Sequence, residues 1–348
     1  MGAKYISNKI TFLNVILTFL IVILHAKTPE RWGLVLDMNY MFIYWVNVLT
    51  QIAVPTFFYI SGLLFYRKCN FECLERKLQS RVDSLLWPYL IWNVIFVVLF
   101  FIMAHIPFLH NKMNMGDVLN SPSEIFNAII NSRYSVLWFV KDLLIFNVFS
   151  AAVLFFLRSL RLSIFIWLLS IFFALTVEGG NESVYRWFPM YFSGAIVGRY
   201  FLDKSDGSYC CIWDYLSHSI RKLFVALSVG VFMALYILSG LYSDTIFFFI
   251  FRLLSPLIIW VLVDVCFGNY LQNKFKTRSW MKYMFFIFCT HQFILNILQK
   301  LVVLSYPPTH FILNITFVIS PIIVVLLLIL LARYLSRFSF YKYLSGGR

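Results

Sequence analysis

Runs of apolar residues alternate with short polar segments along the whole chain. A helix needs roughly 17–25 mostly apolar residues to cross the hydrocarbon core of a bilayer, and ten runs approach or reach that length. The pattern therefore predicts an all-α fold, a polytopic integral membrane protein with about ten transmembrane helices. The expected spans lie near residues 10–26, 44–66, 85–104, 136–157, 162–177, 185–201, 220–240, 246–266, 282–304 and 311–333.

The composition excludes a soluble protein. Hydrophobic residues make up 61% of the chain and charged residues 13%, whereas soluble domains carry about 45–50% and about 25%. So few charges cannot cover a surface that faces water. The net charge of +14 would suit nucleic acid, but Lys and Arg occur in short clusters between the apolar runs. Membrane lipids are therefore the expected partners, and nucleic acid is not.

The distribution of Lys and Arg predicts the orientation, because these residues are retained on the cytoplasmic side. With the N-terminus inside, 21 of the 29 fall in cytoplasmic segments and six in outer segments. Both termini are therefore expected in the cytoplasm. No small-x-small cleavage site follows His25, so the first span is expected to remain uncleaved. We expect one transmembrane domain over residues 1–340 and a short cytoplasmic tail, 341–348.

The longest outer segment, roughly residues 105–135, contains NSPSEIFNAIINSRY. The apolar spacing after Ser123 fits a short amphipathic helix on the outer face, with a plain loop as the alternative. The apolar positions are Ile125, Phe126, Ile129 and Ile130.

The six cysteines do not have the pattern of a secreted disulfide framework. A zinc site is the alternative to reduced thiols, but it needs two loops to meet, and the spacing matches no strong zinc pattern. We therefore expect reduced thiols and no metal. The zinc ligands in that alternative would be Cys69, Cys73, Cys210, Cys211 and His218.

Polar residues inside the predicted spans indicate the functional interior, because they cost free energy in lipid unless they face a cavity or a partner. On the first span, Thr11, Asn14, Thr18 and His25 are 3, 4 and 7 residues apart and fall on one stripe of a helix. His25 is then the outer end of a polar track that starts near the cytoplasm. The alternative is a histidine at headgroup level that bonds water or a carbonyl.

Other spans carry polar residues too. His291 lies in the ninth span, with Gln292 on a neighbouring face. Lys141 and Asp142 in the fourth can neutralise each other as a buried pair, and Arg252 in the eighth can extend outward. Together these residues predict a polar cavity across much of the bilayer, with two histidines that titrate near neutral pH.

Segments spread over nearly the whole chain resemble the membrane acyltransferase 3 family, integral-membrane O-acyltransferases of surface polysaccharides. FLNVILTFLIVILH resembles the family's first span, which ends in the catalytic histidine, here His25. VPTFFYISGLLFYRK resembles its second span, and RVDSLLWPYLIWN resembles its basic loop and Pro-Tyr entry into the third. VLWFVKDLLIF, FPMYFSGAIVGRY and FFIFCTHQFIL resemble later spans. The family usually has arginine at the positions that Asn14 and Ser84 hold here.

The resemblance implies a co-substrate, acetyl-CoA or another acyl-CoA, that approaches from the cytoplasm, with no permanently bound cofactor. It implies a carbohydrate hydroxyl as acceptor near the outer leaflet, and a bacterial inner membrane as location. His25 is then the general base and His291 a second catalytic candidate, while Ser61 can instead take the acyl group covalently. The expected donor-binding residues are Asn14, Lys77, Arg81, Arg158 and Arg161, and the expected cavity-lining residues are Thr18, Gln51, Ser61, Trp138 and Gln292.

Two other function classes also fit a polar interior. A transporter or flippase of a lipid-linked saccharide or acyl donor more often has internal repeats, which are not visible here. A lipid-sugar-dependent glycosyltransferase needs paired acidic residues in the first outer loop, where only Glu30 and Asp37 stand, well apart.

Overall fold

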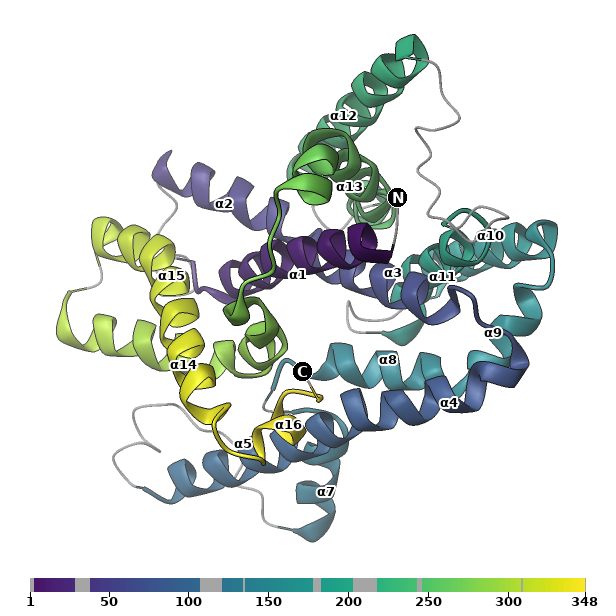
Figure 1. The fold of residues 1–348 in the computed structure, drawn as a ribbon. Helices are drawn as coiled ribbons and strands as arrows, with labels where there is room; N and C mark the ends of the chain where they lie inside the picture. Colours follow the sequence, from purple (N-terminus) through teal and green to yellow (C-terminus); the bar gives the residue numbers. More distant parts are fainter. Residues whose placement is uncertain are drawn as a thin grey trace.

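The computed structural model describes residues 3–28, 38–106, 121–133, 135–177, 183–202, 218–242, 246–307 and 309–347. These residues form helices joined by short segments (Figure 1). The helices are α1 (Ala3–His25), α2 (Met38–Thr50), α3 (Ala53–Tyr66), α4 (Phe71–Arg81), α5 (Trp87–His105), α7 (Pro122–Ile130), α8 (Trp138–Val148), α9 (Ser150–Phe156), α10 (Leu160–Thr176), α11 (Val184–Tyr200), α12 (His218–Leu241), α13 (Ile246–Asn273), α14 (Met284–Ser305), α15 (His310–Leu335) and α16 (Tyr341–Leu344). A π-helical turn, Val82–Leu86, and a 3-10 turn, Ser279–Tyr283, complete them.

Each predicted span falls on helix. Within the described residues, seven helical segments are long and apolar enough to cross a membrane, and the pair α8 and α9, bent by 63°, makes an eighth if it is one span. The other two predicted spans are α10 and α11, with 17 residues each, at the short limit for a crossing. The structure therefore confirms an all-helical membrane protein, whereas the ten-span count and the cytoplasmic termini stay predictions.

Helix α1 crosses the middle of the molecule, with α3, α13, α14 and α15 packed around it (Figure 1). Its residues Leu13, Leu17 and Ile21 are almost fully buried. These apolar positions repeat every four residues, so one side of α1 packs into the core while neighbouring polar positions share another side. This central place lets α1 present its polar stripe to the interior.

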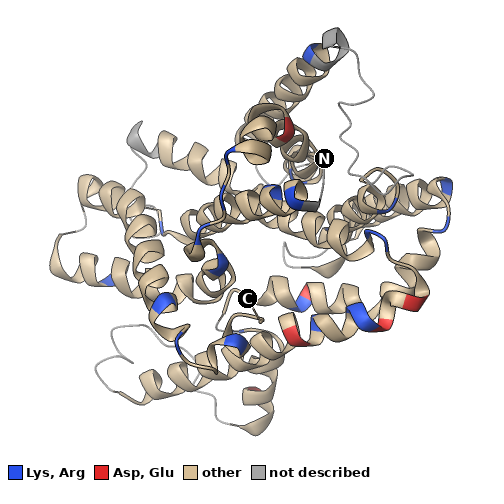
Figure 2. Ribbon diagram, in the orientation of Figure 1, with Lys and Arg blue, Asp and Glu red and all other residues tan. Residues whose placement is uncertain are grey.

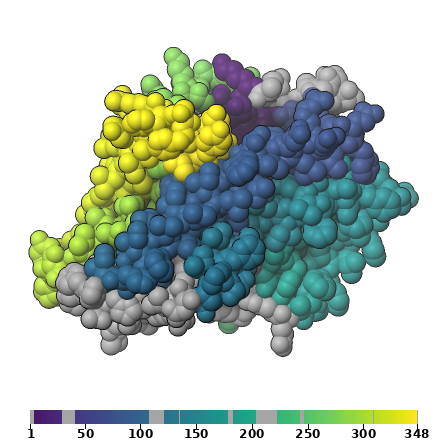
Figure 3. Space-filling view, turned by 90° about the horizontal axis from the view of Figure 1, so that it is seen from below, coloured from purple at the N-terminus to yellow at the C-terminus, as the bar shows by residue number. Residues whose placement is uncertain are grey.

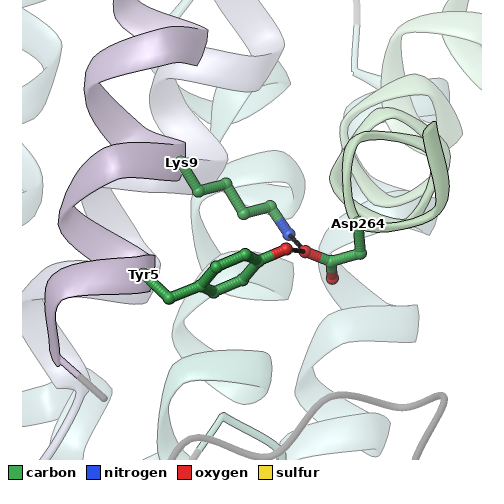
Figure 4. Close-up of polar contacts among 3 residues, drawn as sticks. All are labelled: Tyr5, Lys9 and Asp264. Atoms are coloured by element: carbon green, nitrogen blue, oxygen red, sulfur yellow. Dashed lines mark hydrogen bonds and ion pairs between the residues drawn. The ribbon is translucent and has the colours of Figure 1, made fainter. Parts of the chain in front are cut away.

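A buried ion pair fixes α1 against α13. Lys9 Nζ lies 2.7 Å from Asp264 Oδ1, and the Tyr5 hydroxyl donates to the same oxygen at 2.5 Å (Figure 4). The Lys9 ammonium also lies 3.5 Å from the centre of the Trp260 ring, close enough for a cation–π contact. Lys9 is five positions before Asn14 and so points to a different side of α1, which means that its charge faces α13.

Helices α3 and α11 approach each other closely through glycine. A Cβ at Gly62 would collide with the backbone of Tyr191, one at Gly194 with the backbone of Tyr59, and one at Gly198 with the backbone of Leu63. Small residues four apart let helix backbones pack tightly in a membrane. The contact holds Ser61 of α3 and Tyr191 of α11 on the same side of the interior.

Replacement of Gly194 by Leu should therefore destabilise the protein severely. Overpacking costs about 1–3 kcal/mol where side chains can yield, and here the obstacle is backbone. We expect the thermal unfolding midpoint of the detergent-solubilised protein to fall by several degrees or the protein not to accumulate. Gly230→Leu is the control, because a Cβ there would meet no atom of the described chain within 4 Å apart from the adjoining backbone of its own helix. Equal behaviour of the two variants would contradict the close approach of α3 and α11.

The basic loop predicted before the third span is instead helical. Helix α4 continues through the π turn Val82–Leu86 into α5. A π turn inserts an extra residue into the helical ladder and is often found at functional sites. Figure 2 shows most of the ribbon without charge and residues of both signs on α4.

The predicted outer amphipathic segment forms α7, as expected. The Ser121 hydroxyl accepts from the amide of Glu124 and caps the helix, and Pro122 occupies its first turn, a position that does not need an amide donor. Phe126 remains 65% exposed, while Ile125 and Ile129 pack against Val97 and Ala128. The location of this helix on the outer face stays a prediction.

The C-terminal residues pack onto the bundle. The Trp92 indole donates to the carbonyl oxygen of Leu344 at 3.0 Å, and Tyr341 is buried. In Figure 3 this yellow C-terminal segment lies against the blue helix α5. Within the predicted tail, residues 341–347 are thus fixed to the transmembrane helices, while the domain division itself stays a prediction.

Candidate active site

A cavity of about 120 Å³ lies between α1, α3, α8, α11, α14 and the π turn after α4. Its lining combines polar residues with a larger number of aromatic and aliphatic ones. Its polar lining residues are Asn14, Thr18, Ser61, Arg81, Asn147 and Tyr191, and its apolar ones are Phe57, Leu64, Leu85, Phe139, Val140, Leu143, Met284, Phe285 and Phe288.

The structure brings four of the predicted site residues together in this cavity. Asn14 and Thr18 come from the polar stripe of α1, Ser61 from α3 and Arg81 from the end of α4. Arg81 is the one cation among the described residues that line the cavity, and its guanidinium also lies 5.6 Å from the centre of the Phe65 ring. A positive charge therefore sits at one side of a mostly neutral cavity.

The other predicted donor-binding residues lie elsewhere. Lys77 donates to the carbonyl oxygens of Phe65 and Arg67, so it caps the last turn of α3, where a cation is favoured. Arg158 and Arg161 are exposed around the α9–α10 connection. None of these three lines the cavity.

Two predicted cavity residues, Gln51 and Trp138, lie outside the cavity lining, next to Arg252 and Trp187 respectively. The Arg252 guanidinium donates to Gln51 Oε1 at 2.5 Å and lies 5.4 Å from the centre of the Trp187 ring. Trp138 lies 5.5 Å from Trp187, between ring centroids. The Arg252 guanidinium also lies 4.1 Å from the centre of the Phe248 ring, one turn nearer the start of α13, so the expectation that it extends outward stays a prediction. Gln292 is half-buried and lies outside the cavity lining.

The expected pairing of Lys141 with Asp142 is wrong. No ion pair joins them in the described part of the chain, where the pair between Lys9 and Asp264 is found instead. Adjacent residues on an α-helix point about 100° apart. Asp142 accordingly faces the protein interior, fully buried, while Lys141 is half-buried.

His25 and His291 lie in direct contact. Nδ1 of His25 is 3.3 Å from Nε2 of His291, and the ring centroids are 5.0 Å apart in an edge-to-face arrangement. His291 is fully buried, whereas His25 is half-buried. Because His291 is seven residues after Met284, the pair lies roughly 10 Å along α14 from the start of that helix. Full burial of the His291 ring places this contact inside the helix bundle, while the depth of His25 in the membrane stays a prediction.

The hydrogen bonds determine where the protons lie on the neutral rings. Nδ1 of His291 is 2.8 Å from the carbonyl oxygen of Phe288, and Nδ1 of His25 is 2.9 Å from that of Ile21. A carbonyl oxygen only accepts, so both Nδ1 atoms carry hydrogen. His291 Nε2 then accepts from His25 Nδ1–H, and Nε2 of neutral His25 is the unprotonated, basic nitrogen.

The cavity ends short of the histidine pair. Neither histidine lines it, and the ring of Phe288 stands at the boundary, with its centroid 6.2 Å from that of His291. The predicted polar track is therefore not continuous, because phenylalanine rings interrupt it between Thr18 and His25.

Two free thiols lie where α3 is joined to α4, Cys69 on the connecting segment and Cys73 in the first turn of α4. The Sγ atoms of Cys69 and Cys73 are 3.4 Å apart, and burial raises the pKa of the Cys69 thiol to about 11. Cys69 is thus a protonated thiol at neutral pH. Within the described residues, no three His, Cys, Asp or Glu side chains are grouped to hold a metal, and Cys210 and Cys211 lie outside those residues.

A family model decides the class of the protein. The acyltransferase 3 model, described as an acyltransferase domain, matches residues 8–334. The chain belongs to this family. The match covers nearly the whole chain and all the segments that carry the resemblance, so the protein is a membrane acyltransferase. No curated protein and no solved structure matches it.

The acyltransferase has cavity residues that the sequence analysis missed. Asn147 was identifiable as a polar residue within an apolar span, but Tyr191 carries no such signal. Ser84, which stands at a usual arginine position of the family, donates to the carbonyl oxygen of Ser80 and does not line the cavity. Of the two residues at positions where the family usually has arginine, Asn14 therefore lines the cavity and Ser84 does not.

Proposed function

We propose that this acyltransferase moves an acyl group, an acetyl group in the first instance, from cytoplasmic acyl-CoA to a carbohydrate hydroxyl, as an O-acetyltransferase of the bacterial inner membrane. The observation that carries the proposal is the contact between His25 and His291 just beyond a cavity lined by Arg81. It supports an imidazole base beside a site for an acyl donor. The membrane lipids and a surface or lipid-linked carbohydrate are the remaining proposed partners.

His25 is the proposed general base. Its Nε2 takes the proton of the attacking hydroxyl, the C–O ester bond forms as the C–S bond of the thioester breaks, and the proton passes to the departing CoA thiolate. Such a base contributes about 10²–10⁴-fold. The Nδ1–H of the imidazolium is meanwhile held by Ile21 O and His291 Nε2, so His291 acts as a positioning residue, through His25.

Arg81 is the proposed contact for the anionic donor. A guanidinium forms strong, charge-assisted hydrogen bonds to phosphate oxygens, and the phosphates of CoA are too large to enter a cavity of about 120 Å³ with the acyl group. They would therefore remain at its Arg81 side while the narrow pantetheine arm enters. Asn14, Thr18 and Asn147 offer neutral hydrogen-bonding groups to that arm.

One assay separates this proposal from a transporter. Membranes of cells that carry the protein are incubated with acetyl-CoA labelled in the acetyl group, and the label is followed into alkali-labile carbohydrate esters. We expect covalent label that depends on the protein. Label that enters vesicles but stays on CoA would support transport and contradict the transferase.

Replacement of Arg81 by Ala should weaken donor binding. Loss of a hydrogen bond to a charged group costs about 1.5–3 kcal/mol, which corresponds to a rise of about tenfold or more in KM for acetyl-CoA. Arg161→Ala is the control, because Arg161 is exposed and away from the cavity. A change confined to acceptor KM would place the donor elsewhere.

A further inference from the structure

An aromatic layer closes the cavity on the side of the histidines. Phe57, Phe139 and Phe288 all line the cavity, with ring centroids 6.0 Å apart between Phe57 and Phe139 and 5.7 Å apart between Phe139 and Phe288. They come from α3, α8 and α14, three helices that the chain brings together from distant segments. The polar lining therefore leads to a wall of three rings.

The rings differ in their position relative to the histidine pair. Phe139 packs against Phe58 with centroids 4.5 Å apart, and Phe58 is in turn stacked on Trp187 at 5.5 Å. Phe288 instead has the cavity on one side and the ring of His291 on the other. Of the three, Phe288 is thus the ring that an acyl group must pass to come within reach of the histidine pair.

The cavity has a volume of about 120 Å³. A thioester with its adjoining methylene groups fits there, and the wall of rings then limits how far an acyl chain extends toward the histidine pair. Apolar pockets discriminate by about 10–200-fold for one methylene group, so an aromatic wall here has a measurable effect.

We propose that Phe288 is the specificity-determining residue for the acyl donor, limiting the acyl group that reaches the histidine pair to a short one and keeping water from the thioester. This inference rests on the proposed function, because it assumes that an acyl-CoA occupies the cavity. Transfer then requires the Phe288 side chain to turn aside. When the ring has turned, only a thioester with a short acyl group reaches His25. The ring also separates the donor from water on the acceptor side.

The test is donor selectivity in Phe288→Ala. Release of CoA from acetyl-, butyryl- and hexanoyl-CoA is measured in membranes that contain the acceptor, and again with detergent-solubilised protein without acceptor. In the wild type, kcat/KM should fall at least tenfold from acetyl to hexanoyl. Phe288→Ala should raise the hexanoyl-to-acetyl ratio at least tenfold and should increase acceptor-free hydrolysis of acetyl-CoA several-fold.

A second phenylalanine of α14 provides the control. Phe293→Ala makes the same truncation on α14, where Phe293 packs against Phe96 and does not line the cavity; its selectivity should match the wild type. Phe288→Leu keeps apolar bulk and should shift the ratio in the same direction, so it decides the matter if the Ala variant does not fold. An unchanged ratio in a Phe288 variant that still uses acetyl-CoA would overturn this inference alone, whereas a wild type that transfers no acyl group would overturn the proposed function.

Discussion

His25→Ala should abolish acyl transfer while the protein still folds and inserts. Removal of the imidazole leaves the attacking hydroxyl without a base, and the expected loss is about 10²–10⁴-fold in kcat. Binding of acetyl-CoA should change little, because Arg81 and the cavity lining are separate from the histidine pair. The measurement is label transferred from acetyl-CoA per amount of monodisperse, correctly inserted protein.

His105→Ala is the matched control for this variant. The His105 ring makes the same kind of bond, from Nδ1 to the carbonyl oxygen four residues earlier, 2.8 Å away on Phe101, but it is exposed at the end of α5. We expect activity within twofold of the wild type. Near-normal transfer by a well-folded His25→Ala protein would remove the base from the mechanism.

Lys9→Ala should cause the largest loss of stability among single side-chain deletions. It leaves the carboxylate of Asp264 buried with its cation removed, and breaking a buried ion pair typically costs about 3–5 kcal/mol. Asp264→Ala should cost a similar amount, and replacement of both residues by Leu should recover much of it, because two apolar side chains need no partner. Unfolding of detergent-solubilised protein by heat or denaturant measures the effect.

The control for the ion pair is Lys4→Ala, since Lys4 is exposed on the same helix. Its unfolding midpoint should match the wild type. If the double Leu variant were no more stable than the single variants, the ion pair would not be the source of the loss. If the double variant folded but lost transfer, the pair would also orient α1 for catalysis.

The spans were predictable from sequence because a lipid environment demands long apolar helices, and each predicted range falls on helix. Partners were harder to predict. Lys9 is close enough to the predicted inner end to be counted with the cytoplasmic cations, and its partner Asp264 is 255 residues away. Arg252 has a side chain long enough to reach either outward or inward, and only the fold places Gln51 beside it.

The candidate site was predictable in part. The spacing of Asn14 and Thr18 placed both on one polar stripe, and they share the cavity. Both histidines were identified as candidates, but a contact between residues 266 positions apart has no signal in one sequence. The phenylalanine wall is also invisible there, because an apolar residue in a membrane span is the expected residue whether it faces lipid, core or substrate.

A cryo-EM map of the protein with a non-hydrolysable acetyl-CoA analogue tests the central claim most directly. We expect the phosphates of the analogue near Arg81, its arm beside Asn14 and Thr18, and its acyl carbon within reach of Nε2 of His25, with the Phe288 ring turned aside. Density for the analogue at a different face of the bundle, with the cavity empty and the histidine pair unchanged, would contradict the account.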